Sequence, residues 1–213
     1  MKRILKGTLN YYSFFLAIFL LAFLAGCNGV TGPELKTLTI QPNQNEGNDS
    51  MVIEEYPRTN YGDSAVLQIG KKHEKTVRTY LKFDLSVLPY GAHVVNADLK
   101  LYQHQTSGNE NYSITVHTVT ESWSEEAITW NNQPSYSENV ESAVYVIPGA
   151  EIWLSWDIRF LVDDWVTGYM NNYGVVLKDD DSQGSTFITC WSSEWGYEPE
   201  LRPRLVITYS LPS

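Results

Sequence analysis

The feature that most restricts the fold of this chain is a succession of short β-prone segments separated by turn residues. The segments are AVLQIG, TYLKFDL, VVNADLKLYQ, YSITVHTV, SAVYVIP, EIWLSW, YGVVLK, STFITCW and RLVITYS. Turn signals such as PYGAH, TSGNEN, IPGAE and DDDSQGS lie between them. Many short strands with Gly, Pro and Asn at their ends predict an all-β fold, an antiparallel β-sandwich of jelly-roll type.

One segment, DIRFLVDDWVTG at residues 157–168, departs from the strand pattern. Its apolar residues follow helical spacing, Asp157 is placed to cap the N-terminus, and Gly168 stands where a helix commonly ends. We therefore expect one short amphipathic helix, with Trp165 in its apolar stripe as a core anchor.

The first 26 residues have the pattern of an export signal. The positively charged MKRILKG precedes FFLAIFLLAFLA, an uncharged apolar run shorter than the ~20 residues of a transmembrane helix. The following LAGC resembles the bacterial lipobox, in which the cysteine thiol is lipidated and becomes the mature N-terminus. We expect a signal peptide at 1–26, lipid on Cys27, a tether over 27–35 and a folded domain over 36–210. The protein would then be exported and anchored to the outer surface of the membrane, or to the outer membrane of a Gram-negative cell.

The charge and the cysteines restrict the partners. The formal net charge is −10, and loss of the basic signal peptide leaves the mature chain still more acidic. Such a surface repels nucleic acid and anionic lipid, so we expect no nucleic-acid partner and membrane contact only through the lipid. With Cys27 lipidated, Cys190 has no disulfide partner and is expected to be a buried strand residue. We expect a monomer without a cofactor.

Several motifs resemble those of one known family. They are RTYLKFDLSVLPYGAHVVNADLKLY, ESWSEEAITWNNQP, the helix followed by NYGVVLK, the closing PRLVITY and an earlier NYG at 60–62. In order and spacing these motifs resemble the DNRLRE-domain family, also classed as carbohydrate-binding module family 96, over nearly all of 36–209. The resemblance implies a jelly roll that occurs with polysaccharide-degrading or cell-surface proteins. It also implies binding of uronate-rich polysaccharide such as alginate.

The strand TVRTYLKFDL carries two cations and an aromatic ring on one face. Arg78, Tyr80 and Lys82 alternate with Leu81 and Phe83, so they share the face opposite the core. Guanidinium, phenol and ammonium groups in a row suit an acidic sugar. The resemblance implies this binding role for Tyr80 and Lys82, and extends it to Arg78, Arg58 and Arg202. The alternative is an ordinary solvated strand face.

The tryptophans are the second set of candidates for sugar contact. We expect Trp123 and Trp130 to be structural, in a strand that enters a turn. Trp153 and Trp156 have opposite parity in one strand, so one of them should face outward. Trp195 beside Tyr197 is the alternative sugar platform.

Catalysis and metal binding have weaker candidates. Adjacent carboxylates occur at Glu125–Glu126 and Asp163–Asp164. A glycosidase needs two carboxylates at a defined distance across the scissile bond, and the sequence alone cannot place any pair at that distance. A polysaccharide lyase would need Tyr80 close to His104 or His117. Structural calcium is conceivable at Asp179, Asp180 and Asp181, although their spacing is not that of an EF-hand. The sequence thus predicts a non-catalytic module that binds acidic polysaccharide. The alternatives are a structural or adhesive envelope protein with a protein partner, and a jelly-roll lyase.

Overall fold

The computed structural model describes residues 32–108, 112–179 and 185–212, and Pro33–Ser213 is one compact unit. The strands are β1 (Leu35–Ile40), β2 (Asp49–Ile53), β3 (Val66–Lys72), β4 (Lys75–Leu81), β5 (His93–Ser107), β6 (Tyr112–Thr118), β7 (Ser142–Val146), β8 (Ile152–Asp157), β9 (Val175–Lys178), β10 (Thr186–Trp191) and β11 (Arg204–Ser210). The helices are α1 (Arg159–Thr167) and the 3₁₀ turns η1 (Trp130–Asn132) and η2 (Pro199–Leu201).

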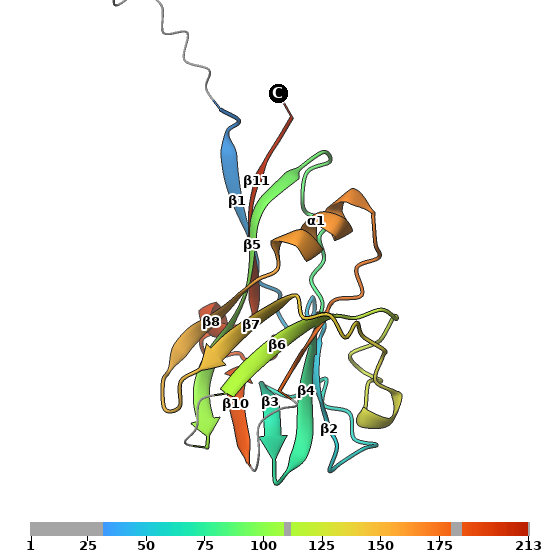
Figure 1. The fold of residues 1–213 in the computed structure, drawn as a ribbon, viewed down its shortest axis with the longest axis vertical. Coiled ribbons are helices and arrows are strands. Elements are labelled where there is room, and N and C mark those ends of the chain that lie inside the picture. The colour runs from blue at the N-terminus through green and yellow to red at the C-terminus, as the bar shows by residue number, and fades with distance from the viewer. Residues whose placement is uncertain (1–31, 109–111, 180–184, 213) are drawn as a thin grey trace, which may run out of the picture. The chain divides into compact units, whose positions relative to one another are not determined.

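The strands pair antiparallel in the order β1-β11-β5-β10-β3-β4-β9-β6-β7, with β2 on β4 and β8 on β5. This sheet curls so that β6 and β7 lie across the layer formed by β5 and β10 (Figure 1). Trp156 of β8 crosses between the layers and donates its indole N–H to the Ile114 carbonyl of β6 at 2.9 Å. The predicted fold class, an antiparallel β-sandwich with one short helix, is confirmed.

The main core lies between the two layers, because alternate residues of each strand point inward. Trp156, Leu99, Leu101, Ile114, Leu177 and Ile188 are among its fully buried side chains. Cys190 is also fully buried in this core, where burial raises the pKa of its thiol. The cysteine is therefore a packing residue, as predicted, and not a reactive thiol.

Helix α1 forms where its periodicity predicts and packs on the main core through Leu161 and Val162. Trp165 packs against the same core and is half-buried. Gly168 ends the helix at φ 75°, a left-handed conformation that glycine adopts without strain. The N-cap prediction is off by one residue, because Ile158 holds that position. Asp157 still accepts the backbone N–H of Arg159 at 3.0 Å.

A second apolar cluster covers the outer side of β2, β4 and β9. It contains Val52, Tyr80, Val119, Ile128 and Val176, with Trp123, Trp130, Tyr136 and Tyr173 packed against them. The 119–136 segment, which runs from the end of β6 toward β7, provides many of the residues that pack over these strands. One sheet therefore has apolar packing on both faces, which a two-layer sandwich does not require.

The predicted export signal, Cys27 and most of the tether lie outside the described residues. Among the helices that the structure describes, none has the length and apolar character needed to span a membrane.

Candidate functional site

The strand face that carries Arg78, Tyr80 and Lys82 is covered by the 119–136 segment. Tyr80 is 0% exposed, although its parity is as predicted: Leu81 faces the main core and Tyr80 faces the other side. The expectation of an open face is therefore wrong at Tyr80, because a connection distant in sequence folds over it. Tyr80 has no exposed ring with which to stack on a sugar.

Tyr80 instead holds the covering segment in place. Its ring meets Trp123 edge-on with centroids 5.8 Å apart, and its hydroxyl donates to Gln133 Oε1 at 3.1 Å. Arg78 Nη1 donates to the same amide oxygen at 3.2 Å. One glutamine of the TWNNQP motif thus accepts hydrogen bonds from two of the residues expected to bind sugar.

The Arg78 guanidinium is half-buried among aromatic rings. Its central carbon lies 5.1 Å from the Trp130 ring centroid and 5.3 Å from that of Tyr136. Lys178 of β9 places its ammonium 5.3 Å from the same Tyr136 ring. These distances allow cation–π attraction, so Arg78 is fixed by stacking as well as by hydrogen bonding.

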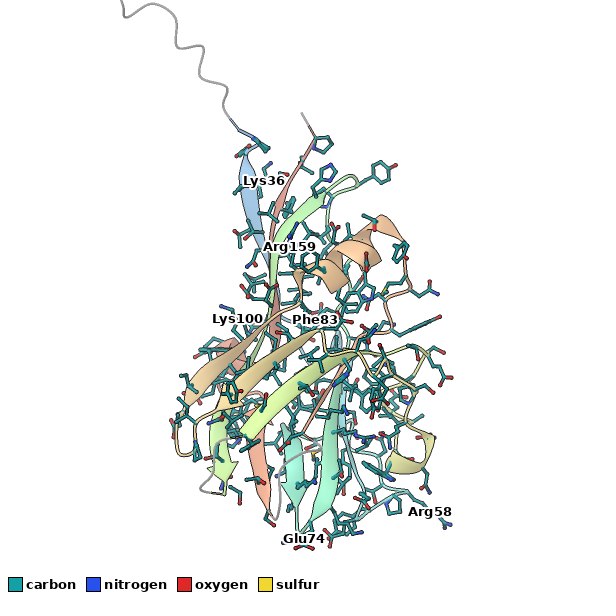
Figure 2. All side chains as sticks on the ribbon, in the orientation of Figure 1. Lys36, Arg58, Glu74, Phe83, Lys100 and Arg159 are labelled. Carbon is teal, nitrogen blue, oxygen red and sulfur yellow. The ribbon has the colours of Figure 1, made fainter. Side chains whose placement is uncertain are left out.

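The other predicted basic residues do not join Arg78 in one patch. Lys82 lines a small groove beside Asp84 and Asn172. Arg58 is exposed in the turn after β2, whereas Arg202 lies just before β11 and donates its Nε–H to the Trp195 carbonyl at 2.7 Å. Figure 2 shows Arg58 and Lys100, a residue of β5 paired with Arg204 of β11, on opposite sides of the domain. The five residues predicted as one surface are thus divided between two.

The outer face of β5 carries a row of stacked rings that sequence reasoning did not assemble. His104 of β5 stacks on Trp191 of β10 at 3.7 Å and 7°, and Trp191 stacks on Trp195 at 3.6 Å and 8°. Tyr197 continues the row at 5.1 Å from Trp195 and is 87% exposed. Burial lowers the pKa of His104, with partial opposition from Glu151, so the histidine resists protonation. The predicted pair Trp195 and Tyr197 is the outer end of this row.

Further along β5, the same face carries cations beside aromatic rings. Tyr102 pairs with Trp153 of β8, and their rings meet edge-on at 5.5 Å. The Arg204 guanidinium lies 3.9 Å from the Trp153 centroid, and Lys100 is the cross-strand partner of Arg204. We define the outer β5 face as Lys100, Tyr102, His104, Trp153, Trp191, Trp195, Tyr197, Arg202 and Arg204.

The remaining tryptophan predictions agree with the structure, except that the strand expected at Trp130 is wrong because Trp130 begins the 3₁₀ turn η1. Trp156 is buried and Trp153 faces outward, as their opposite parity requires. Trp123 donates its indole N–H to the Tyr173 carbonyl at 2.8 Å, and both Trp123 and Trp130 pack in the second apolar cluster. Both residues are therefore structural.

The pairing expected for the lyase alternative, Tyr80 close to His104 or His117, is not assembled. Tyr80 and His117 both flank Val176 of β9 in the strand register, which sets them two strand spacings apart, about 10 Å. Both His117 ring nitrogens are engaged, with the Ser137 carbonyl at 2.9 Å and the Thr115 hydroxyl at 3.0 Å. His104 belongs to the outer β5 face. Of the residues considered for calcium, Asp179 is buried, while Asp180 and Asp181 lie outside the described residues.

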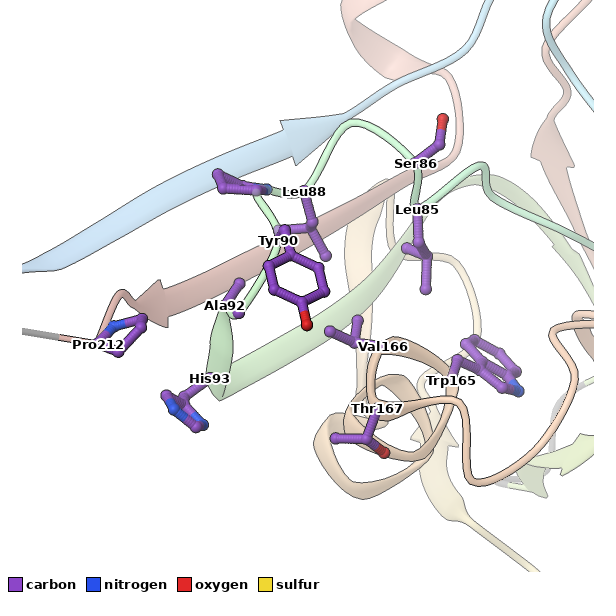
Figure 3. Close-up of a pocket in the computed structure, with 12 residues that line it drawn as sticks. Leu85, Ser86, Leu88, Tyr90, Ala92, His93, Trp165, Val166, Thr167 and Pro212 are labelled. Carbon is purple, nitrogen blue, oxygen red and sulfur yellow. The ribbon is translucent and has the colours of Figure 1, made fainter.

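An apolar groove of about 820 Å³ lies between the 85–93 segment and the C-terminal half of α1 (Figure 3). Leu85, Trp165 and Val166 line it, and the fully exposed Tyr90 stands at its edge. Its lining includes no lysine, arginine or carboxylate side chain, and His93 is its one titratable imidazole. The groove therefore does not suit an acidic sugar.

An antiparallel β-sandwich that displays aromatic rings and cations on an outer strand face has the construction of a carbohydrate-binding module. The family model of carbohydrate-binding module family 96 matches residues 41–209. The chain belongs to this family, as its motifs predicted.

Proposed function

We propose that this protein is a lipid-anchored cell-surface module that binds acidic, uronate-rich polysaccharide without transforming it. The observation that carries the proposal is the outer β5 face, where Lys100, Arg202 and Arg204 accompany a row of aromatic rings. The chain as a whole has a net charge of −10, so cations gathered on one face supply the local attraction that an anionic glycan needs.

The chemistry of the face fits alternating carboxylates and sugar rings. Stacking on Trp153 uses the face of the Arg204 guanidinium and leaves its terminal Nη donors to meet a carboxylate, whereas its Nε is shielded from solvent. Tyr197 offers an exposed ring and hydroxyl for a pyranose. Because Trp191 and Trp195 cover one another, they contribute ring edges and rigidity rather than an open platform.

Arg78, Lys82 and Arg58 stay predicted contributors, on or near β2 and β4 and away from the outer β5 face. Arg78 and Lys178 gather at Tyr136, so an acidic residue of the polysaccharide has a second place to bind if the chain wraps around the domain. The roles of these residues can be separated from that of the outer β5 face, because the two groups lie on different strands.

The test is calorimetric binding of alginate and of a neutral glucan to the full-length protein in detergent. Arg204→Ala and Tyr197→Ala should each weaken alginate binding by about 5- to 100-fold, the equivalent of about 1–3 kcal/mol. Arg58→Ala removes an exposed arginine from the opposite side and tests the second group, and Lys36→Ala, an exposed lysine outside both groups, serves as the matched control.

Parent-like affinity in Arg204→Ala and Tyr197→Ala would refute the proposed surface. Loss in Arg58→Ala alone would return the site to the predicted β4 face. Equal affinity for the neutral glucan would remove the acidic specificity, and release of unsaturated uronate from alginate would show that the protein is a lyase.

A further inference from the structure

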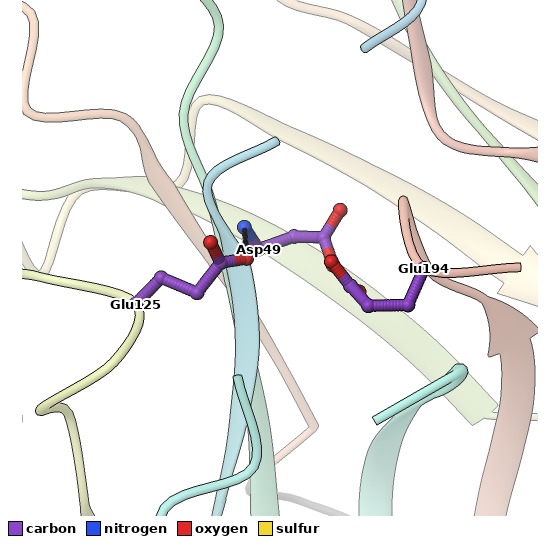
Figure 4. A group of neighbouring side chains, drawn as sticks. All are labelled: Asp49, Glu125 and Glu194. Atoms are coloured by element: carbon purple, nitrogen blue, oxygen red, sulfur yellow. Dashed lines mark hydrogen bonds between the residues drawn. The ribbon is translucent and has the colours of Figure 1, made fainter. Parts of the chain in front are cut away.

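Three carboxylates from distant parts of the chain meet beside the start of β2. They belong to Asp49 at the first position of β2, Glu125 in the WSEE motif and Glu194 in the loop after β10. One oxygen from each lies within 4.8 Å of the others. Asp49 stands between Glu125 and Glu194 (Figure 4). Sequence reasoning could not find this cluster, because no local spacing links the three positions.

Asp49 is buried, Glu125 and Glu194 are half-buried, and the cluster is only partly satisfied by hydrogen bonds. Asp49 is 2% exposed and accepts the backbone N–H of Ser193 at 3.1 Å. Glu125 Oε1 accepts the backbone N–H of Asp49 at 2.9 Å, and Glu194 Oε1 accepts the Ser193 hydroxyl at 2.9 Å. Glu194 Oε2 is shielded from solvent and has no hydrogen-bond partner among the described residues. A buried, unpartnered carboxylate oxygen beside two further carboxylates lacks a positive counterpart.

The neighbouring charges also affect how readily these carboxyl groups ionise. Burial, and then the charges of Glu194 and Glu125, raise the pKa of Asp49 well above its ordinary value. Burial is also the main reason that the pKa of Glu125 rises to about 7. Three carboxylate oxygens within 4.8 Å of one another repel when ionised, and a cation among them offsets that repulsion.

We propose that Asp49, Glu125 and Glu194 form a binding site for a hard divalent cation, with calcium as the best-fitting ion. Oxygen ligands favour calcium or magnesium over zinc or copper. At calcium–oxygen distances of 2.3–2.6 Å, oxygens on opposite sides of the ion lie about 4.6–5.2 Å apart. Separations within 4.8 Å let one ion reach an oxygen of each side chain. Calcium accepts irregular carboxylate cages, whereas magnesium demands a near-ideal octahedron and usually keeps several waters.

The surrounding loops pack tightly around this cluster. A Cβ on Gly62 would lie 2.7 Å from the Glu125 carbonyl oxygen, and one on Gly47 would collide with the Ser193 side chain. Asn60 donates to the carbonyls of Glu125 and Ile128, both at 2.7 Å. The NYG motif at 60–62 thus fixes the turn that presents Glu125. A cavity of about 420 Å³ adjoins Glu125 and Glu194, and Gln44, Asn45 and Asp63 line it as further oxygen donors.

A cation here would join three segments that support the aromatic surfaces. Glu194 directly precedes Trp195 of the outer β5 face, and Glu125 lies two residues after Trp123 of the second cluster. Binding of the ion would therefore stabilise the fold and fix Trp195. This inference concerns metal binding and stability, and it does not depend on which glycan the protein binds.

The test uses the full-length protein in detergent, stripped with EDTA and dialysed, with calcium chloride as the probe. Calorimetry should show one calcium per chain, and 1 mM calcium should raise the Tm by about 5–10 °C if the ion is near 100-fold above its Kd. Magnesium at the same concentration should have a smaller effect.

Variants separate a cation site from a cluster held by protons. Glu194→Gln and Glu125→Gln keep a side-chain carbonyl for the observed hydrogen bonds, so both should fold. In EDTA each should melt at or above the parent Tm, because repulsion is relieved; in calcium each should lack the rise. Glu138→Gln, an exposed carboxylate outside this cavity with the same charge change, should keep the full rise. An unchanged parent Tm without heat of binding, or a full calcium response in Glu194→Gln and Glu125→Gln, would overturn the proposal.

Discussion

Truncation of Tyr80 should destabilise the fold rather than abolish sugar contact. Tyr80 is 0% exposed and lies between Ser50 of β2 and Val176 of β9 in the strand register, with its ring against Trp123. Tyr80→Ala should therefore cost about 3–5 kcal/mol of unfolding free energy, as for other buried aromatic truncations. For a domain of this size, that loss lowers Tm by about 6–20 °C.

Tyr80→Phe isolates the hydroxyl from the ring. It removes one hydrogen bond to Gln133, whose Oε1 keeps the Arg78 donor, so the loss should be about 1 kcal/mol. Tyr145→Ala is the matched control, because Tyr145 is 78% exposed on β7 and its truncation should change stability by less than about 0.5 kcal/mol.

The measurement is urea and thermal unfolding followed by circular dichroism, with alginate binding recorded well below each Tm. We expect the folded fraction of Tyr80→Ala to bind as the parent does. If Tyr80→Ala unfolds at the same denaturant concentration as Tyr145→Ala but binds alginate weakly, Tyr80 is an exposed sugar contact and the described cover is wrong.

Two further predictions concern the anchor and pH. Cys27→Ser should move the protein from the membrane fraction to the soluble fraction, because a polar tether and an acidic domain offer little other membrane affinity; unchanged fractionation would contradict lipidation. Because the folded-state pKa of His104 is lowered, the unfolded chain binds more protons below its pKa of about 6.5, so folding stability falls as pH drops through that value toward the folded pKa. His104→Gln should therefore show a shallower loss of unfolding free energy between pH 7 and pH 5, and parallel curves for variant and parent would refute this assignment.

Local patterns predicted what depends on near neighbours in the chain. The 157–168 periodicity placed α1 to within two residues at either end, and Gly168 marked its C-terminus. Strand parity separated Trp153 from Trp156 and Leu81 from Tyr80 correctly. Parity states which face a residue occupies, but it does not state what lies on that face.

The sequence by itself therefore determined the all-β class, the helix, the family and the acidic character of the chain, because each follows from composition, periodicity or adjacent motifs. Only the tertiary structure decided that the 119–136 segment buries Tyr80, that His104, Trp191 and Trp195 stack, and that Asp49, Glu125 and Glu194 converge. Apart from the Trp191–Trp195 stack, these contacts join residues tens of positions apart, and their geometry depends on how the sheet curls and where its loops return. The packing of the whole domain decides this geometry, and no single stretch of sequence specifies it.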